Sequence, residues 1–228
     1  MHEIKRNIRR RLGELDIRQP AREGDRRASV LLLILERGEP VLLAIARGTQ
    51  GSHPGQFGLP GGRPEPVDAS SWDTAIREAR EEIGLEDHVE SLGFLGEYNT
   101  RASRFQVDVH VGWLHERPRW RPDGVEVAGV LEVPFSFLER EVRRLPEVSH
   151  AWELPIEAGF EFDAAPFLMA GEVPERGVGH RLLREGRELE LPFVWGLTAR
   201  VLYDFIRLVW RPATAACGET LEPRRQTR

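Results

Sequence analysis

Residues 68–85, DASSWDTAIREAREEIGL, carry the clearest structural pattern of this 228-residue chain. Ser70 and Asp73 have the spacing of a capping box, and Gly84 stands where a C-terminal cap glycine is expected. These boundaries predict a helix from about residue 71 to residue 83. At 100° per residue, four apolar side chains fall within about 60° of one another and predict the buried stripe of the helix. The four are Trp72, Ile76, Ala79 and Ile83.

Three glutamates of this stretch, Glu78, Glu81 and Glu82, cluster on one side of the predicted helix because their spacings match its turn. Like-charge pairs at three and four residues destabilise a helix by about 0.2–0.5 kcal/mol each. A solvated acidic face tolerates that cost, with Arg77 or Arg80 in partial compensation. A ligand site is the other explanation, and helix spacing by itself leaves both open.

A glycine-rich segment, GTQGSHPGQFGLPGG over residues 48–62, precedes the helix. It holds six glycines and two prolines, and a backbone without Cβ atoms can approach a ligand closely. Three carboxylates beside such a loop make an oxygen-rich site that suits Mg²⁺ or Mn²⁺. The two segments together favour a metal site without establishing it.

The composition is that of an ordinary globular protein, with 40% hydrophobic and 8% aromatic residues. With 32 basic and 37 acidic residues, the formal net charge is −5, which argues against nucleic-acid binding through bulk positive charge. The single cysteine, Cys217, excludes an intramolecular disulfide and a thiolate-based zinc site. The longest apolar run, residues 30–35, is far shorter than the ~20 residues of a membrane-spanning helix. Residues 1–15 lack the apolar region of a signal peptide, so we expect a cytoplasmic protein.

Elsewhere in the chain, apolar runs predict strands with interleaved helices, which indicates an α+β or mixed α/β class. Helices are expected over residues 1–15 and 194–210, with a helical turn at 138–145. Strands are expected at 29–35, 41–46, 92–98, 105–114 and 125–133. The first two of these runs are apolar nearly throughout, so at least one should be covered on both faces.

The domain organisation follows from these elements. Residues 1–24 are expected to be a basic helix and linker, whose basic face is either solvated surface or an attraction for phosphate. Residues 25–212 are expected to form a single domain, in which residues 146–190 give no clear pattern. Residues 213–228 are expected to be a disordered tail.

The acidic helix and the end of the glycine-rich loop together resemble the Nudix box, G-x5-E-x7-R-E-U-x-E-E-x-G-U with U apolar. Gly62 and Asp68 have the spacing of its first half, and residues 77–85, REAREEIGL, match its second half. Aspartate at position 68, one extra residue before Arg77, and the serine at position 70 are typical of a subgroup that resembles coenzyme A diphosphatases.

Three other segments resemble the same subgroup. Residues 53–62, HPGQFGLPGG, are similar to its H-x-G-Q-x-x-F-P-G-G pattern. Residues 126–127 and 133–134 are similar to its EV and VP segment, and residues 195–200, WGLTAR, to its W-G-x-T-A motif. The resemblance therefore extends well beyond the box.

The resemblance implies an α/β fold, a Nudix-type α/β/α sandwich around a mixed β-sheet with a loop–helix–loop catalytic motif. It also implies a reaction in which water attacks phosphorus and cleaves the diphosphate of a nucleoside compound. Such a reaction concentrates negative charge on phosphoryl oxygens, so it depends on cations and on positioning. Mg²⁺ or Mn²⁺ is the expected cofactor.

Site residues carry over from the matching positions. The implied catalytic set is Glu78, Glu81, Glu82, Glu126 and Arg77. The implied metal ligands are the Gly61 carbonyl, Glu78, Glu81 and Glu82. Arg77 is expected to form a salt bridge with Asp68 that braces the loop. Glu126 is the preferred candidate for the general base and Glu97 a weaker one, and each is otherwise a surface glutamate.

The implied substrate is coenzyme A or a derivative, cleaved to 4′-phosphopantetheine and adenosine 3′,5′-bisphosphate. Candidate substrate contacts are Arg47, His53, Arg101 and Arg104. The alternatives are hydrolysis of another nucleoside diphosphate compound, such as ADP-ribose or NADH, and a nucleotide sensor without turnover. We expect a small-molecule nucleotide as partner, no nucleic acid and no membrane, and a homodimer as one possible assembly.

Overall fold

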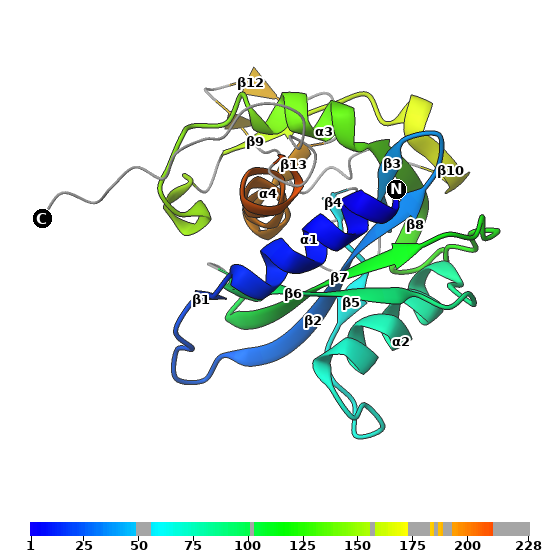
Figure 1. Ribbon diagram of the computed structural model, residues 1–228, viewed down its shortest axis with the longest axis horizontal. Helices are drawn as coiled ribbons and strands as arrows, with labels where there is room; N and C mark the ends of the chain where they lie inside the picture. The colour runs from blue at the N-terminus through cyan, green and yellow to red at the C-terminus, as the bar shows by residue number, and fades with distance from the viewer. Residues whose placement is uncertain are drawn as a thin grey trace, which may run out of the picture.

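The computed structural model describes residues 1–48, 56–100, 103–155, 158–172 and 193–211, together with the backbone of residues 183–184 and 187–188. Its centre is a mixed sheet in which the described strands follow the order β1-β6-β7-β2-β3-β8-β10 (Figure 1). Strand β4 pairs with β3, and β5 pairs with β2. Helices lie on both faces of this sheet.

The sheet is built on the parallel pair β2 and β7, which stay in register from Arg26 opposite Phe105 to Leu35 opposite Leu114. Its strands are β1 (Ile17–Arg18), β2 (Arg26–Glu36), β3 (Pro40–Arg47), β4 (Phe57–Gly58), β5 (Gly61–Gly62), β6 (Glu90–Asn99), β7 (Phe105–Leu114), β8 (Val127–Pro134) and β10 (Leu168–Gly171). Outside it, β9 (Gly159–Glu161) pairs with β13 (Phe193–Trp195), and β11 (Leu183–Arg184) with β12 (Arg187–Glu188).

The alternation of side chains along β2 explains why both faces of the sheet are covered. Leu31, Leu33 and Leu35 belong to the core beneath α2, whereas Leu32 and Ile34 belong to the core on the opposite face. All five are fully buried, and successive side chains of a strand point to opposite faces. The prediction that an apolar run is covered on both faces is confirmed.

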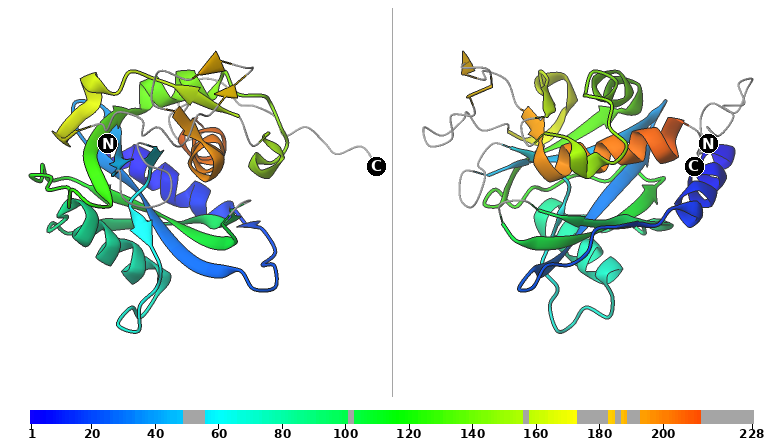
Figure 2. Two further views of the ribbon diagram at one scale, coloured as in Figure 1. Left: turned by 180° about the vertical axis from the view of Figure 1, so that it is seen from behind. Right: turned by 90° about the vertical axis from the view of Figure 1, so that its left-hand side faces the viewer.

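Helix α2 (Ser71–Ile83) lies on one face of the sheet, and α1 (His2–Glu14), α3 (Phe135–Val142) and α4 (Gly196–Asp204) lie on the other (Figure 1, Figure 2). Two short 3-10 turns, η1 (Ala151–Glu153) and η2 (Ala165–Phe167), connect the remaining strands. The expected α/β/α sandwich around a mixed sheet is therefore confirmed. None of the helices in the described ranges is long and apolar enough to cross a membrane.

Helix α2 begins and ends at the predicted residues. The Ser70 Oγ accepts a hydrogen bond from the Asp73 N–H at 3.2 Å, which satisfies one of the free donors of the first turn. Gly84 has a φ of 68°, and this left-handed conformation ends the helix. Both caps are local interactions, which is why the sequence predicts them.

The predicted buried stripe of α2 is wrong in part. Trp72 and Ile76 are only half-buried, whereas Thr74, Ala75 and Glu82 are buried. Ala79 and Ile83 are buried as predicted. Small side chains in the middle of the buried face let the helix approach β2 closely, and the two large apolar side chains lie at its edge.

Three other predictions are corrected by the structure. The segment predicted as a helix and linker, residues 1–24, also contains β1, which pairs in parallel with β6. The single helix predicted over residues 194–210 is β13, then α4, then a π-helical segment (Phe205–Trp210). Gly196, with a φ of 58°, allows the chain to turn from strand into helix. Within residues 146–190, β10 adds an edge strand that its short, weakly patterned sequence did not reveal.

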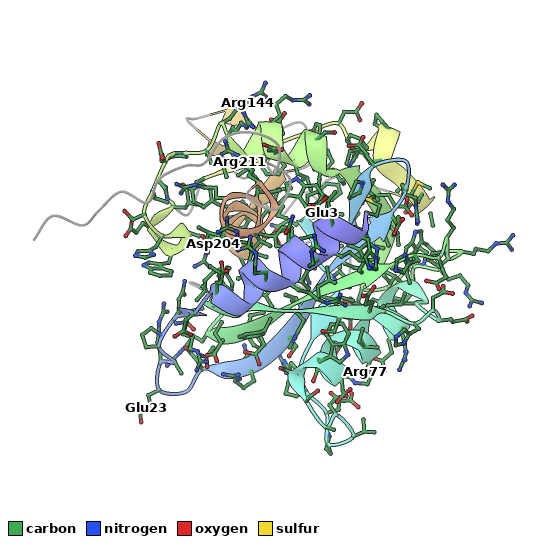
Figure 3. The ribbon with its side chains drawn as sticks, in the orientation of Figure 1. Glu3, Glu23, Arg77, Arg144, Asp204 and Arg211 are labelled. Atoms are coloured by element: carbon green, nitrogen blue, oxygen red, sulfur yellow. The ribbon has the colours of Figure 1, made fainter. Side chains whose placement is uncertain are left out.

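A buried polar pair joins the sheet to α4. The Tyr98 hydroxyl donates a hydrogen bond to the Asp204 Oδ2 at 3.0 Å, and both residues are buried. Asp204 is labelled in Figure 3. Burial raises the pKa of Asp204 to about 6, although the Tyr98 hydroxyl and the charge of Arg207 oppose this rise. Folded Asp204 therefore holds its proton where the unfolded chain has lost it.

The Asp204 carboxyl group should make the protein less stable as the pH rises from about 4 to about 6. The unfolded carboxyl has a pKa of 3.8, so unfolding in this range releases a proton and is favoured by higher pH. We expect the free energy of unfolding of the wild type, relative to Asp204→Asn, to fall by up to about 3 kcal/mol across this window. Denaturant unfolding at a series of pH values measures this difference. Asp16→Asn, at an exposed aspartate, is the control, and equal pH profiles for wild type and Asp204→Asn would contradict the prediction.

Candidate active site

Glu82 is the deepest member of the acidic cluster on α2. It is only 5% exposed, and its Oε2 accepts a hydrogen bond from the Gly61 N–H at 2.9 Å. Burial raises the pKa of Glu82 to about 8, and the charges of Glu78 and Glu126 act in the same direction. The Gly61 N–H and the charge of Arg47 oppose this rise. Glu82 is thus a buried carboxyl group among other carboxylates, an environment that a bound cation would stabilise.

Glu78 lies against the two glycines of β5. A Cβ atom on Gly62 would come within 2.5 Å of the Glu78 carboxyl group, so any side chain at this position would displace that carboxyl. Gly61 has a φ of +150°, and a Cβ atom there would be 2.2 Å from the Ser29 carbonyl oxygen. Burial is the main cause of a raised pKa at Glu78, and Arg77 opposes it. The glycines therefore let β5 pass directly beside the carboxylates of α2.

Arg77, labelled in Figure 3, is the cation among these carboxylates. Its Nε is 3.1 Å from the Asp68 Oδ1, its Nη2 is 3.1 Å from the Glu78 Oε1, and its Nη1 is 2.9 Å from the Glu81 Oε2. The Nη2 also donates to the Arg63 carbonyl oxygen at 2.8 Å. The hydrogen bonds from Arg77 are the main reason that the pKa of Asp68 is lowered to about 2. The predicted ion pair between Arg77 and Asp68 is confirmed.

Glu126 is held beside the cluster by Asp123. The Asp123 Oδ1 accepts hydrogen bonds from the N–H groups of Val125, Glu126 and Val127 at 2.9, 3.0 and 2.8 Å. The Asp123 N–H donates to the Glu82 carbonyl oxygen at 3.0 Å, which ties this loop to the last turn of α2. The charge of Glu126 contributes to the raised pKa of Glu82, so the structure brings these two predicted residues together.

Asp123 is a site residue that the sequence analysis missed. A local pattern in the sequence indicates it, because Asp123 and Gly124 form a dipeptide typical of turns. In such turns the aspartate side chain accepts hydrogen bonds from backbone N–H groups. Gly124 has a φ of 76°, which a glycine adopts without strain. The apolar strand pattern of residues 125–133 follows this dipeptide directly and is the stronger signal in the sequence.

Two of the four predicted substrate contacts lie in the described part of the chain. Arg47, at the end of β3, is close enough to Glu82 to lower its pKa. The Arg104 guanidinium instead donates to the carbonyl oxygen of Glu23, in the turn before β2. The other two, His53 and Arg101, lie outside the described residues.

Glu97, the weaker candidate for the general base, lies away from this cluster. Its Oε2 accepts a hydrogen bond from the Gln106 Nε2 at 2.7 Å and is 4.0 Å from the Arg27 Nη1. These contacts join β6, β7 and β2. The geometry therefore favours Glu126 over Glu97 as the carboxylate nearest to the acidic helix.

The donor set fits a hard divalent cation, since carboxylate oxygens are the ligands that Mg²⁺ and Mn²⁺ prefer. Within the described residues, no group of three or more His, Cys, Asp or Glu side chains is already gathered to hold a metal. Glu81 is turned toward Arg77, and Glu82 toward the Gly61 N–H. A cation at this site would compete with these two contacts. The Gly61 carbonyl stays a prediction, because the contact that the structure shows is made by its N–H.

Comparison with known proteins identifies the family of this chain. A family model described as the NUDIX domain matches residues 25–153. An uncharacterised Nudix hydrolase, NudL, of Yersinia enterocolitica is 34% identical over 177 residues, 77% of this chain and 77% of the relative. NudL of Yersinia pestis is 32% identical over 180 residues, 78% of this chain and 77% of the relative. Among solved structures, the NUDIX domain of Shewanella oneidensis NrtR complexed with ADP ribose is 18% identical, with a TM-score of 0.42, over 52% of this chain and 79% of that chain.

The ion pair between Arg77 and Asp68 should stabilise the loop that precedes α2. We expect Asp68→Asn and Arg77→Ala each to lower the free energy of unfolding, and the double variant to lose less than the sum of the two, because both remove the same interaction. Denaturant unfolding of the four proteins gives this cycle. Arg80→Ala, on the exposed face of the same helix, is the control. Strict additivity would show that the pair contributes nothing.

Proposed function

We propose that this chain, which belongs to the Nudix hydrolase family, hydrolyses the diphosphate of coenzyme A or of a coenzyme A derivative. The products would be 4′-phosphopantetheine and adenosine 3′,5′-bisphosphate. Membership of the family supports the general activity, that of a pyrophosphohydrolase. The choice of coenzyme A as the substrate rests on the contacts described next.

The observation that carries the proposal is that segments resembling the coenzyme A diphosphatase subgroup meet in space. The Trp195 Nε1–H, from the WGLTAR segment, donates to the Gln56 Oε1 in the glycine-rich segment at 2.9 Å. The Gly48 N–H donates to the Glu126 carbonyl oxygen at 2.7 Å. Arg47 lies opposite Val127 in the β3–β8 pair. These segments are far apart in the sequence, and the contacts join them in pairs. Arg47 and Glu126 are also close enough to Glu82 for their charges to act on its pKa.

Nudix hydrolases use divalent metal ions, and we propose that Glu78, Glu81, Glu82 and the Gly61 carbonyl hold Mg²⁺ or Mn²⁺ here. Such an ion, when bound, neutralises charge that develops on the phosphoryl oxygens. The fold keeps these carboxylates close to Gly61 and Gly62, which have no side chains. The two glycines of β5 allow the diphosphate to reach the site, and Arg77 holds the loop and helix in one orientation.

Glu126 is proposed as the general base that takes a proton from the attacking water. It is exposed, so water has access to it, and the Asp123 turn fixes its backbone. A carboxylate within reach of the attacking water can take its proton as a general base. Arg47, whose charge acts on Glu82, is proposed to contact a phosphate of the substrate.

Two alternative functions of the same site make different predictions. Hydrolysis of ADP-ribose or NADH needs the same carboxylates but no recognition of a third phosphate. A nucleotide sensor without turnover needs the substrate contacts but not the carboxylates. All three box glutamates are present, which favours an enzyme. Cytoplasmic location and a homodimer stay predictions.

A product assay against a substrate panel tests the proposal. Purified protein with Mg²⁺ or Mn²⁺ is offered coenzyme A, an acyl-coenzyme A, dephospho-coenzyme A, ADP-ribose, NADH and a diadenosine polyphosphate. We expect the highest kcat/KM with coenzyme A or its acyl form, at least about tenfold above dephospho-coenzyme A, because one charge-assisted contact contributes about 1.5–3 kcal/mol. If dephospho-coenzyme A or ADP-ribose is the equal or better substrate, the coenzyme A assignment is wrong. Absence of turnover with every compound would favour the sensor.

Glu82→Gln should separate the role of this buried carboxylate in catalysis from its effect on the stability of the fold. The amide keeps an oxygen for the Gly61 N–H but removes the charge, so we expect kcat/KM to fall at least about 100-fold. The melting temperature should be unchanged or higher, because burial of the charge is unfavourable. Glu14→Gln, on an exposed part of α1, is the control for activity. Near-wild-type activity at saturating Mg²⁺ would exclude Glu82 as a metal ligand.

A further inference from the structure

A second cluster of charged residues lies beside the glycine strand. The Cζ atoms of Arg26 and Arg63 are 4.2 and 5.3 Å from the centre of the Phe105 ring. Both arginines are exposed, and Phe105 is half-buried. Two guanidinium groups therefore share one aromatic ring at the surface, in an arrangement that cation–π attraction stabilises.

The backbone around Arg26 and Phe105 holds these groups in place. Arg26 and Phe105 are opposite each other in the β2–β7 pair. Arg63 directly follows Gly62, which pairs with Ser29 of β2. The Arg26 Nη2 also donates to the Ser103 carbonyl oxygen at 3.0 Å. Arg26 and Phe105 thus lie on neighbouring strands of one sheet, and Arg63 is the residue that follows β5.

The positive charges of this pair are not matched by carboxylates. Among the described residues, neither Arg26 nor Arg63 forms an ion pair. The adjacent Arg27, by contrast, contacts both carboxylate oxygens of Asp108 at 2.9 Å, and Arg77 is surrounded by carboxylates. Most N–H groups of Arg26 and Arg63 are therefore available to an anion from solvent.

The arginine pair is next to the acidic cluster along the same segment. Gly62 lies against the carboxyl group of Glu78, and Arg63 is the following residue. The Arg63 carbonyl oxygen accepts a hydrogen bond from the Arg77 Nη2 at 2.8 Å, so its position is coupled to that of α2. A ligand whose diphosphate binds at the carboxylates can reach the arginines with a second anionic group.

We propose that Arg26 and Arg63, stacked on Phe105, bind a phosphomonoester of the substrate that is separate from the diphosphate under attack. This inference rests on the proposed function and names the residues that would recognise the third phosphate. A guanidinium group can give two parallel N–H donors to one phosphate, and Phe105 keeps the two groups on one surface.

Binding measurements without added metal test the arginine pair independently of turnover. Calorimetric titration compares adenosine 3′,5′-bisphosphate with adenosine 5′-monophosphate, which lacks the second phosphomonoester. We expect wild type to bind the bisphosphate at least about tenfold more tightly. Arg26→Ala and Arg63→Ala should each reduce this preference about threefold or more and leave the affinity for the monophosphate unchanged. Arg63→Lys, which keeps the charge but loses the paired donors, should fall between Arg63→Ala and wild type.

The same variants are then compared in turnover. The ratio of kcat/KM for coenzyme A to that for dephospho-coenzyme A should fall in parallel with the binding preference. Arg6→Ala, at an exposed arginine of α1, should change neither quantity.

The possible results separate the two hypotheses. If wild type shows no preference for the bisphosphate, or if the preference survives in the double variant Arg26→Ala, Arg63→Ala, the arginine pair is not the site. If the preference depends on the arginines but coenzyme A is not hydrolysed, the phosphomonoester site stands and the proposed substrate is wrong.

Discussion

The hydrogen bond from the Gly61 N–H to the Glu82 carboxyl group is the contact on which the rest of the site depends. It fixes β5 against the last turns of α2, and it gives a buried carboxyl group one of its few polar partners. Burial of such a group is unfavourable unless hydrogen bonds or opposite charges compensate. Next to this contact, Gly62 has no side chain and leaves room for the Glu78 carboxyl group. The loop after Trp120 then closes over the helix end by binding the Glu82 and Ile83 carbonyl oxygens.

Local signals account for the parts that the sequence predicted well. The ends of α2 depend on a serine cap and a left-handed glycine, and each of these acts within a few residues. The apolar runs of β2 and β3 are long enough to be read as strands, and their lack of polar positions indicates cover on both faces. The acidic cluster was predictable for the same reason, because helix geometry alone places Glu78, Glu81 and Glu82 on one side.

Non-local contacts account for what the sequence did not reveal. The burial of Glu82 depends on the approach of β5, and helical spacing alone cannot distinguish it from the exposed Glu81. Strands as short as β1 and β10 exist only because the neighbours β6 and β8 are there to pair with them. The arginine pair requires the register of β2 with β7 and of β2 with β5. Contacts of this kind follow from topology, and no pattern within one segment contains them.

The arginines of this chain differ in function according to what they contact. Arg77 and Arg27 are bound by carboxylates, and a guanidinium group in such a pair cannot bind a phosphate without displacing its partner. Arg26 and Arg63 contact an aromatic ring instead, so that the ring supports the face of each group while its in-plane N–H donors stay available. The chain as a whole has a net charge of −5, which disfavours the approach of a polyanion. Selective binding of an anionic substrate therefore requires a few unmatched cations at fixed positions beside the acidic site, and the sheet supplies that fixed geometry.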